Sequence, residues 1–387
     1  MKWATTILIF CVAVLTGLGM VMLYSSSMNM EVGKASLGQN HPVGASYLIS
    51  QLIWCGLGLI ACVVIASTDY RRFKKISPWL LGATAILLIL VFIPGIGVMR
   101  NGGRRWVNLR IIPIFQPSEF AKLALVLFLA SYGERFQRQM AGFKKGLLIP
   151  ACVVIPVIAL IFFEPDRGCS MLLMTVCGVL LFLAGARLTL LIGPAVLLVG
   201  GLALSFMHDP MRLRRIMAWI HPEESKQGVG YQAYEAMIAL GSGGLFGRGL
   251  GNGRQKLDFI PEHHTDFIFS IIGEELGLVV TLAVLVLFIA LVACGIRIAR
   301  RSNDTFGLLL GTGITFMIGM QAFINMGVVT SLLPNKGMPL PFISYGGSNL
   351  LLMLVSIGFL LSIARYAVQT VEKKINPFEA IPEASHA

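Results

Sequence analysis

Ten long apolar stretches divide this chain of 387 residues, and each is long enough to cross a membrane. A hydrocarbon core of about 30 Å needs roughly 20 residues of α-helix. Inside lipid every backbone polar group must be satisfied internally, which leaves helices or closed barrels, and uninterrupted apolar runs suit helices. The expected spans are 4–24, 46–67, 78–96, 117–133, 147–163, 169–186, 188–206, 272–296, 305–329 and 345–366.

The composition agrees with a chain that lies mostly in lipid. It is 56% hydrophobic and 13% charged, and its mean hydropathy is +0.79, whereas soluble domains are about a quarter charged. We therefore predict an all-α polytopic membrane protein with about ten transmembrane helices and a single membrane domain over residues 1–387. A long extracytoplasmic loop occupies about 207–271, between the seventh and eighth spans, and a cytoplasmic tail about 367–387.

Lys and Arg side chains in the short loops indicate the orientation. If the N-terminus is cytoplasmic, the inner loops hold more than twice as many of these cations as the short outer loops. The N-terminal apolar stretch is longer than the core of a typical signal peptide, and no A-x-A cleavage site follows it. We expect an uncleaved first span and both termini on the cytoplasmic side.

The formal net charge of +12 raises the question of an anionic partner. No basic run stands apart from the apolar segments, which argues against nucleic acid. The seven cysteines lie in or beside apolar runs without CxxC spacing, so neither a zinc ribbon nor a disulfide framework is indicated. Cations in the outer loops break the positive-inside trend, and guanidinium groups suit phosphate, from a phosphorylated ligand or from lipid headgroups. These cations are Arg100, Arg104, Arg105, Arg110, Arg212, Arg214, Arg215, Lys226, Arg248, Arg254 and Lys256.

Ionisable residues also lie in or at the mouth of the predicted spans, where they are costly and face a cavity or a partner helix. In "FQPSEFAKLALVLFLA", Glu119 and Lys122 are three residues apart and can pair on one helical face. In "EPDRGCS", Glu164, Asp166 and Arg167 occupy a short link that Pro165 keeps from being helical throughout. Either these groups satisfy one another as interfacial structure, or Asp166 lines a cavity shared with Glu119 and Lys122.

The stretch "FIPEHHTDFIFSIIGEELG" at 259–277 gathers the densest set of titratable groups. His263 and His264 are adjacent, so in a helix they diverge by about 100°, and no HExxH spacing supports a zinc site. Asp266 precedes a buried run, where desolvation raises a carboxyl pKa and a nearby cation lowers it, as suits a general base. Glu274 and Glu275 lie two turns deeper and receive no role.

Two further segments resist regular helix. "GSGGLFGRGLGNGRQK" (241–256) fits neither a P-loop nor a dinucleotide fingerprint, and its glycines favour a loop that packs closely against the membrane domain. "LLPNKGMPLPFISYGGSN" (332–349) contains three prolines and three glycines, so we expect a fixed outer loop that caps a cavity. "RLRRIMAWI" (212–220) is basic and amphipathic, as in a helix that lies at the interface.

Taken in order along the chain, these stretches resemble the SEDS family of bacterial envelope proteins (shape, elongation, division and sporulation). The resemblance rests on "NGGRRWVNL", "FQPSEFAKLALVLFLA", "EPDRG", the segment 241–277 and "LLPNKGMPLPFISYGGSNLL", and it extends over about 100–352. The glycine-rich segment and "NKGMPLPFISYGGS" look closest to the division branch. Arg167 and Cys169 depart from the smaller residues of many members.

The resemblance implies a peptidoglycan glycosyltransferase that polymerises lipid II at the outer face of the cytoplasmic (inner) membrane during division. Undecaprenyl pyrophosphate would leave, and a class B penicillin-binding protein transpeptidase and other division proteins would be partners. It assigns Asp266 as the base, and Glu119, Lys122 and Asp166 to the central cavity. Pyrophosphate ligands would be Lys122, Arg104, Arg105, Arg248 and Arg254, and a divalent cation, Mg or Mn, is chemically reasonable.

Three alternatives stay open at this point. A lipid II flippase would share the cavity and its charges, and a polymerase of the elongation or sporulation branch would share most motifs. A division scaffold without catalysis would need none of the intramembrane charges.

Overall fold

The computed structural model describes residues 2–35, 43–100, 103–108, 114–207, 210–220, 228, 230–255 and 265–375. Within these ranges the chain is almost entirely helical, as the sequence predicts. The α-helices are α1 (Lys2–Ala35), α2 (Val43–Ser67), α3 (Phe73–Leu90), α4 (Pro117–Arg135), α5 (Ile149–Phe163), α6 (Arg167–Leu183), α7 (Leu188–Met207), α8 (Pro210–Ile220), α9 (Tyr231–Ser242), α10 (Ile268–Arg300), α11 (Thr305–Val329) and α12 (Gly347–Ile375). Short 3-10 turns at Tyr70–Arg72 and Gln137–Gln139 and a π-turn at Lys144–Leu148 join some of them.

Each of the ten expected spans overlaps one of these helices. Seven helical stretches of the described chain are long and apolar enough to cross a membrane: Lys2–Ser26, Tyr47–Ser67, Tyr70–Leu90, Lys144–Phe163, Ile268–Arg300, Thr305–Val329 and Gly347–Val368. Helix α6 is apolar but shorter, and α4 and α7 are not among the seven, so three of the ten spans stay predictions. The protein is a multi-pass membrane protein.

The third span is misplaced in the sequence-based prediction. Helix α3 ends at Leu90 rather than near 96, because the chain turns at Pro94 and Gly95, where φ of Gly95 is +92°. It then enters an antiparallel hairpin of β1 (Gly97–Arg100) and β2 (Gly103–Val107), which the sequence did not predict. The hairpin carries three of the expected outer cations, namely Arg100, Arg104 and Arg105.

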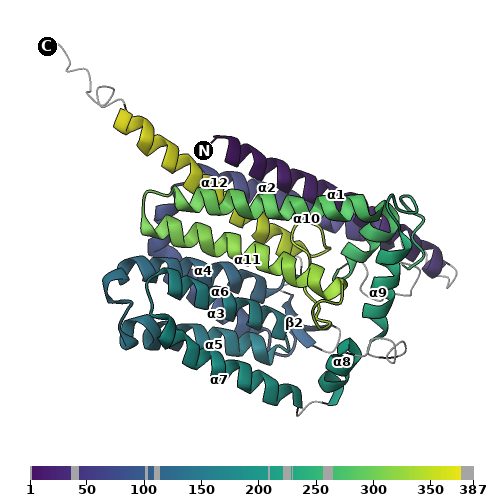
Figure 1. The fold of residues 1–387 in the computed structure, drawn as a ribbon, viewed down its shortest axis with the longest axis horizontal. Helices are drawn as coiled ribbons and strands as arrows, with labels where there is room; N and C mark the ends of the chain where they lie inside the picture. The colour runs from purple at the N-terminus through teal and green to yellow at the C-terminus, as the bar shows by residue number, and fades with distance from the viewer. Residues whose placement is uncertain are drawn as a thin grey trace.

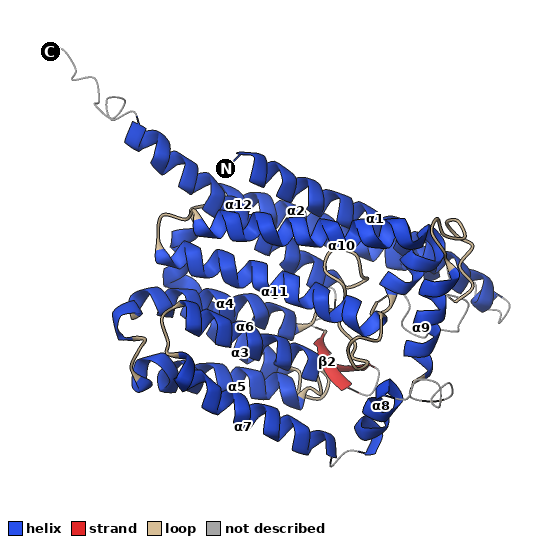
Figure 2. Ribbon diagram, in the orientation of Figure 1, coloured by secondary structure: helices blue, strands red, loops and turns tan. Residues whose placement is uncertain are grey.

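The long helices run side by side along one direction, and the small elements gather at one end of the bundle (Figure 1). The hairpin, α8 and α9 lie at that end, whereas the beginning of α1 and the end of α12 lie together at the opposite end. Figure 2 shows the hairpin and the long loops on the same side of the helices. We refer to this side as the outer end.

Helices α11 and α12 form the centre of the bundle. In their most apolar stretches 61% and 67% of the residues are buried, against 22% in α2 and in α3. The peripheral helices turn large apolar side chains outward, as in Ile60, Val63 and Val64 of α2. Such outward faces suit lipid. The polar residues buried in α11 and α12 therefore lie in the middle of the protein.

Candidate active site

The first part of the site is the beginning of α4. Pro117 occupies the first helical turn, where its missing N–H costs nothing, and Glu119 follows it. The Lys122 ammonium lies 2.7 Å from Glu119 Oε2, and both residues are buried, so the pairing expected from their spacing is confirmed. Isolated charges at this depth would be strongly unfavourable, and pairing offsets part of that cost.

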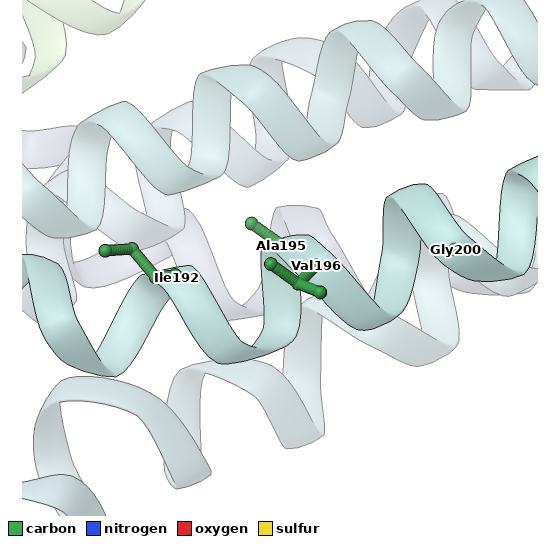
Figure 3. A pocket seen from close by; sticks show the side chains of 4 residues that line it. All are labelled: Ile192, Ala195, Val196 and Gly200. Carbon is green, nitrogen blue, oxygen red and sulfur yellow. The ribbon is translucent and has the colours of Figure 1, made fainter.

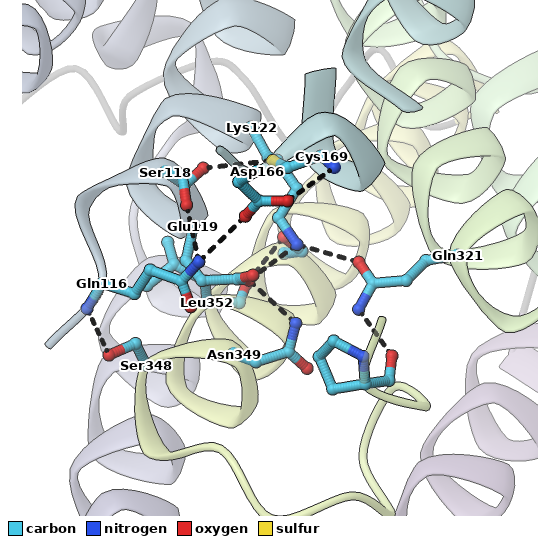
Figure 4. A network of polar contacts seen from close by, with 12 residues as sticks. Gln116, Ser118, Glu119, Lys122, Asp166, Cys169, Gln321, Ser348, Asn349 and Leu352 are labelled. Carbon is cyan, nitrogen blue, oxygen red and sulfur yellow. Dashed lines mark hydrogen bonds and ion pairs between the residues drawn. The ribbon is translucent and has the colours of Figure 1, made fainter. Parts of the chain in front are cut away.

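Uncharged amides complete the coordination of this ion pair. Asn349 of α12 donates a hydrogen bond to Glu119 Oε2 (2.8 Å), and Lys122 donates to Gln321 Oε1 of α11 (2.9 Å). Gln321 in turn donates to the carbonyl oxygen of Pro339 (2.9 Å). The contacts join α4, α11, α12 and the proline-rich segment into one connected set (Figure 4).

Asp166 joins this set from the turn between α5 and α6. It is the N-cap of α6, where its Oδ1 accepts the N–H of Cys169 (3.1 Å) and its Oδ2 accepts Gln116 Nε2 (3.1 Å). Gln116 also donates to Ser118 Oγ (2.9 Å) at the start of α4. Figure 4 shows Asp166 facing the Glu119–Lys122 pair, so the structure brings together the three residues that the sequence assigned to one cavity. We call Gln116, Ser118, Glu119, Lys122, Asp166, Gln321 and Asn349 the buried network.

The same turn also holds a carboxylic acid that sequence reasoning left without a role. Glu164 is 1% exposed, and neither of its carboxyl oxygens has a hydrogen-bond partner among the described residues. Burial, with a smaller contribution from the nearby Asp166 carboxylate, raises the pKa of Glu164 to about 9, and Arg105 opposes the shift. Glu164 is therefore protonated at neutral pH and contributes no charge to the site.

Arg105 reaches this turn from the β-hairpin. Its guanidinium donates to the carbonyl oxygens of Glu164 (3.2 Å) and Pro165 (2.9 Å). Gly103 allows the approach, since a methyl group there would lie 3.2 Å from Pro165 Cγ. Arg104 is exposed beside it. Of the two adjacent arginines on β2, Arg105 is thus engaged with the protein and Arg104 is exposed.

Asp266 lies at the outer end, two residues before α10 begins. Asn325 of α11 donates from Nδ2 to the Asp266 carbonyl oxygen (2.8 Å) and to the Met338 carbonyl oxygen (2.6 Å). The Asp266 carboxylate lies against Gly337, where a methyl group would be 2.4 Å from Oδ2. Asp266 is therefore fixed against the proline-rich segment through its backbone, while its carboxylate is only partly buried.

Gln321 and Asn325 link Asp266 to the buried network. They are four residues apart on α11, hence on one face, and are 0% and 1% exposed. Gln321 is hydrogen-bonded to the Pro339 carbonyl and to the Lys122 ammonium. Asn325 is hydrogen-bonded to the carbonyls of Met338 and Asp266. The sequence-based prediction missed both amides because it rested on charged side chains, and Gln321 and Asn325 are uncharged. Two amides at helical spacing in an apolar span were the available signal.

Glu274 and Glu275, which the sequence left unassigned, bind a different partner. The side chains of Glu274 and Glu275 are both 0% exposed. Glu274 accepts hydrogen bonds from the backbone N–H groups of Arg254 (2.8 Å) and Gln255 (3.2 Å to Oε2). Glu275 Oε2 accepts Ser25 Oγ of α1 (2.6 Å) and the N–H of Gly251 (3.1 Å). These two carboxylates hold the glycine-rich loop, residues 241–255, against α10.

The glycine-rich loop is also joined to α10 through the backbone. Gly277, with φ +79° and ψ −176°, interrupts α10, and its conformation suits only glycine. The interruption leaves N–H groups of Leu278 and Val279 to donate to the carbonyls of Gly244 (2.9 Å) and Leu245 (3.2 Å). In return the N–H groups of residues 248 and 249 donate to the carbonyls of 274 and 275, both at 3.0 Å.

Arg248 and Arg254 lie on this loop rather than in the buried network. The Arg248 guanidinium is 3.5 Å from Glu274 Oε1 and donates from Nε to the Ser242 carbonyl. Arg254 is exposed, and its backbone N–H, not its side chain, binds Glu274. Their role as pyrophosphate ligands stays a prediction.

Several predicted features fall outside the part of the chain that the structure describes. Glu262, His263 and His264 are among them, as are Arg110, Lys226 and Lys256. Among the described residues, no group of three or more His, Cys, Asp or Glu side chains is arranged to hold a metal ion. The expected basic interfacial helix corresponds to α8, whose Trp219 Nε1 donates to the carbonyl of Ser331 (2.8 Å).

An apolar hollow on α7 lies apart from this chemistry. It is lined by Ile192, Ala195, Val196 and Gly200 (Figure 3). The lining offers no charged or hydrogen-bonding side chain, so the hollow suits an acyl chain rather than a reacting group. The ionisable groups lie instead at the buried network and at Asp266.

Known proteins share both the sequence and the fold. The chain matches the model of the FtsW/RodA/SpoVE cell cycle proteins over residues 5–369. A probable peptidoglycan glycosyltransferase FtsW of Trichlorobacter lovleyi is 39% identical over 358 residues, 92% of each chain. Stage V sporulation protein E of Bacillus subtilis is 38% identical over 363 residues, 93% of this chain and 97% of that one.

Solved structures agree with these relatives. A chain of a peptidoglycan synthase complex, studied for the structural coordination of polymerization and crosslinking, superposes with a TM-score of 0.69 at 27% identity, over 94% of this chain and 98% of that one. The crystal structure of the rod shape determining protein RodA of Thermus thermophilus gives a TM-score of 0.64 at 29% identity, over 92% and 95%.

Proposed function

The chain belongs to the FtsW/RodA/SpoVE family of cell cycle proteins, and from this premise we propose that it is a peptidoglycan glycosyltransferase. It polymerises lipid II into β-1,4 glycan strands at the outer face of the cytoplasmic membrane during cell division. A sugar hydroxyl of the acceptor attacks the anomeric carbon of the lipid-linked donor, and undecaprenyl pyrophosphate leaves.

Asp266 is the general base of this proposal. The observation that carries the assignment is that its backbone is fixed by Asn325 while its carboxylate, partly buried, lies at the outer end of the bundle. A base must be held within hydrogen-bond reach of the proton it removes, and a fixed backbone limits the positions that the carboxylate can occupy. General base catalysis contributes typically about 10²- to 10⁴-fold to a rate.

The leaving pyrophosphate requires cations. Lys122 is the deepest candidate, oriented by Glu119 and Gln321, and Arg104, Arg105, Arg248 and Arg254 are further ligands at the outer end. Arginine and lysine stabilise developing negative charge on a phosphate oxygen by charge-assisted hydrogen bonds. A divalent cation that bridges the pyrophosphate and a carboxylate stays a prediction.

The test is polymerisation of purified lipid II by the full-length protein, with its transpeptidase partner where activity requires it. The wild type makes glycan strands without any transport step, whereas Asp266→Asn, which keeps the size of the side chain, loses at least 100-fold in rate. If Asp266→Asn folds normally and still polymerises, the assignment of the base is wrong. If the wild type moves lipid II across vesicles but makes no polymer, the chain is a flippase.

The proposal includes partners and placement in the membrane. The transpeptidase partner is a class B penicillin-binding protein with one span, docked near α10 and α11. On α10 the apolar side chains that such a span could contact, in place of lipid, are Leu278, Val279, Leu282, Leu285, Val286 and Ile289. Both termini are cytoplasmic, in agreement with the Lys and Arg distribution and with α1 and α12 starting and ending at the same end. The 38% identity to stage V sporulation protein E keeps a sporulation role as the second candidate.

A further inference from the structure

Lys336 has received no role so far, although it lies within the proline-rich segment 332–349. It lies in the proline-rich segment between α11 and α12, at the outer end, beside Gly337. Gly337 lies against the Asp266 carboxylate on one side and against Gly168 of α6 on the other. A methyl group added at Gly168 would be 3.6 Å from the carbonyl oxygen of Gly337. Lys336 therefore lies on the short segment that separates Asp266 from the beginning of α6.

The Lys336 side chain points from this segment toward α6. Its ammonium contacts the thioether sulfur of Met171, one turn into the helix. The charged groups that act on it are Asp166 and Arg167 at the start of α6, and Asp266 lies across Gly337. Among the described residues, no ion pair joins Lys336 to a carboxylate. A thioether is a weak acceptor, so the ammonium is poorly satisfied by the protein alone.

Two other cations near Asp166, namely Lys122 and Arg105, already have strong partners. Lys122 binds Glu119 and Gln321, and Arg105 binds two backbone carbonyls. A half-buried ammonium with a weak partner gains most from an incoming anion, because a charge-assisted hydrogen bond to phosphate replaces a poor contact.

We propose that Lys336 binds the diphosphate group of the lipid-linked donor, between the base Asp266 and the first turn of α6. This inference rests on the proposed function and gives the diphosphate a defined place in the site. The ligand chemistry is a polyprenyl diphosphate, which leaves when its bond to the anomeric carbon breaks.

The charge state of Lys336 supplies an independent readout. Burial lowers the pKa of Lys336 to about 8; Asp166 opposes this shift and Arg167 adds to it. The ammonium is charged below pH 8 and loses its proton as the pH rises through 8. A phosphate has its second pKa near about 6, so the ligand stays fully charged over this range. Diphosphate affinity should therefore fall as the pH rises from 7.5 to 9.5.

The experiment measures binding of undecaprenyl diphosphate, with undecaprenyl monophosphate as comparison, to the purified full-length protein at pH 6.5 to 9.5. Lys336→Met should weaken diphosphate binding at pH 7 by about tenfold to a hundredfold and make it independent of pH. Lys336→Arg keeps a charge at every pH tested, so it should retain binding and abolish the alkaline decline. Lys75→Met, an exposed lysine at the opposite end, is the control and should behave as wild type.

Equal diphosphate affinity in wild type and Lys336→Met would overturn the inference, as would an alkaline decline that persists in Lys336→Arg. The two hypotheses can fail separately. If the wild type binds diphosphate through Lys336 but makes no polymer, the binding site stands and the proposed polymerase activity is wrong. Asp266→Asn should bind the diphosphate as wild type does while failing to polymerise.

Discussion

The buried network and the glycine-rich loop both place carboxylates in the membrane domain near the outer end, but they satisfy them differently. Glu119 binds the side chains of Lys122 and Asn349, and Asp166 binds the side chain of Gln116 in addition to capping α6 at the Cys169 N–H. Glu274 binds the backbone N–H groups of the loop, and Glu275 binds one such N–H and a serine. Side-chain partners can change with a proton or a ligand, whereas backbone partners hold a segment in place.

This difference separates chemistry from support. The buried network connects through Gln321 and Asn325 to Asp266, so its charges can respond to a substrate. The loop is joined to α10 by the interruption at Gly277 and by two carboxylates, so we expect it to act as support that presents Arg248 and Arg254 at the outer surface. We expect changes in the first region to lower turnover and changes in the second to lower substrate binding.

The largest effect on stability is expected from breaking the buried ion pair. Lys122→Met leaves the Glu119 carboxylate buried without its counter-ion, with Asn349 still donating to it, which should cost about 3–5 kcal/mol of stability. The double variant Glu119→Gln/Lys122→Met removes both charges and should recover most of that loss without recovering polymerisation. Thermal unfolding in detergent and initial polymerisation rates measure the two effects. A stable and active double variant would make the pair purely structural.

An intermediate effect is expected from Asn325, which positions Asp266. Asn325→Leu leaves the carbonyls of Asp266 and Met338 without their donor and frees the Asp266 backbone. Misplacing a catalytic group by about 1 Å can cost about 10²-fold, so kcat should fall about 10- to 100-fold with KM nearly unchanged. Thr330→Val, which alters an exposed hydroxyl bound within its own helix, is the control. A rise in KM alone would remove Asn325 from the positioning of the base.

The smallest effect on turnover is expected in the glycine-rich loop. Glu274→Gln keeps an acceptor but loses the charge, so protection of the Arg254 and Gln255 amides from hydrogen exchange should fall about tenfold. The value of kcat should stay within about threefold, and KM should rise because Arg248 loses its ion pair. Unchanged exchange at these amides would show that Glu274 does not hold the loop.

The sequence predicted those parts of the site that carry charge or break helices. Glu119 and Lys122 stood out as charges in an apolar run at helical spacing, and Asp166 as an acid in a short link on the same side. Gln321 and Asn325 were missed because uncharged amides change the hydropathy of a span little. The interruption at Gly277 was missed because its replacement hydrogen bonds come from residues 244–249, which only the tertiary structure brings to α10.

The hairpin after α3 shows a further limit. Residues 91–96 are apolar enough to continue a span, and only Pro94 and Gly95 mark the turn. The pairing of Gly97 with Val107 then depends on a strand that comes later in the chain. Hydropathy placed the helix but not the residue at which it ends.

The central claim is that catalysis lies at Asp266 and the buried network, with the glycine-rich loop as support. The most direct test is kcat for lipid II polymerisation at saturating substrate, measured for Asp266→Asn and Glu274→Gln at equal concentrations of folded protein. The prediction is a loss of at least about 100-fold for Asp266→Asn and a change within about threefold for Glu274→Gln. Comparable losses in both variants, or a larger loss in Glu274→Gln, would contradict the claim.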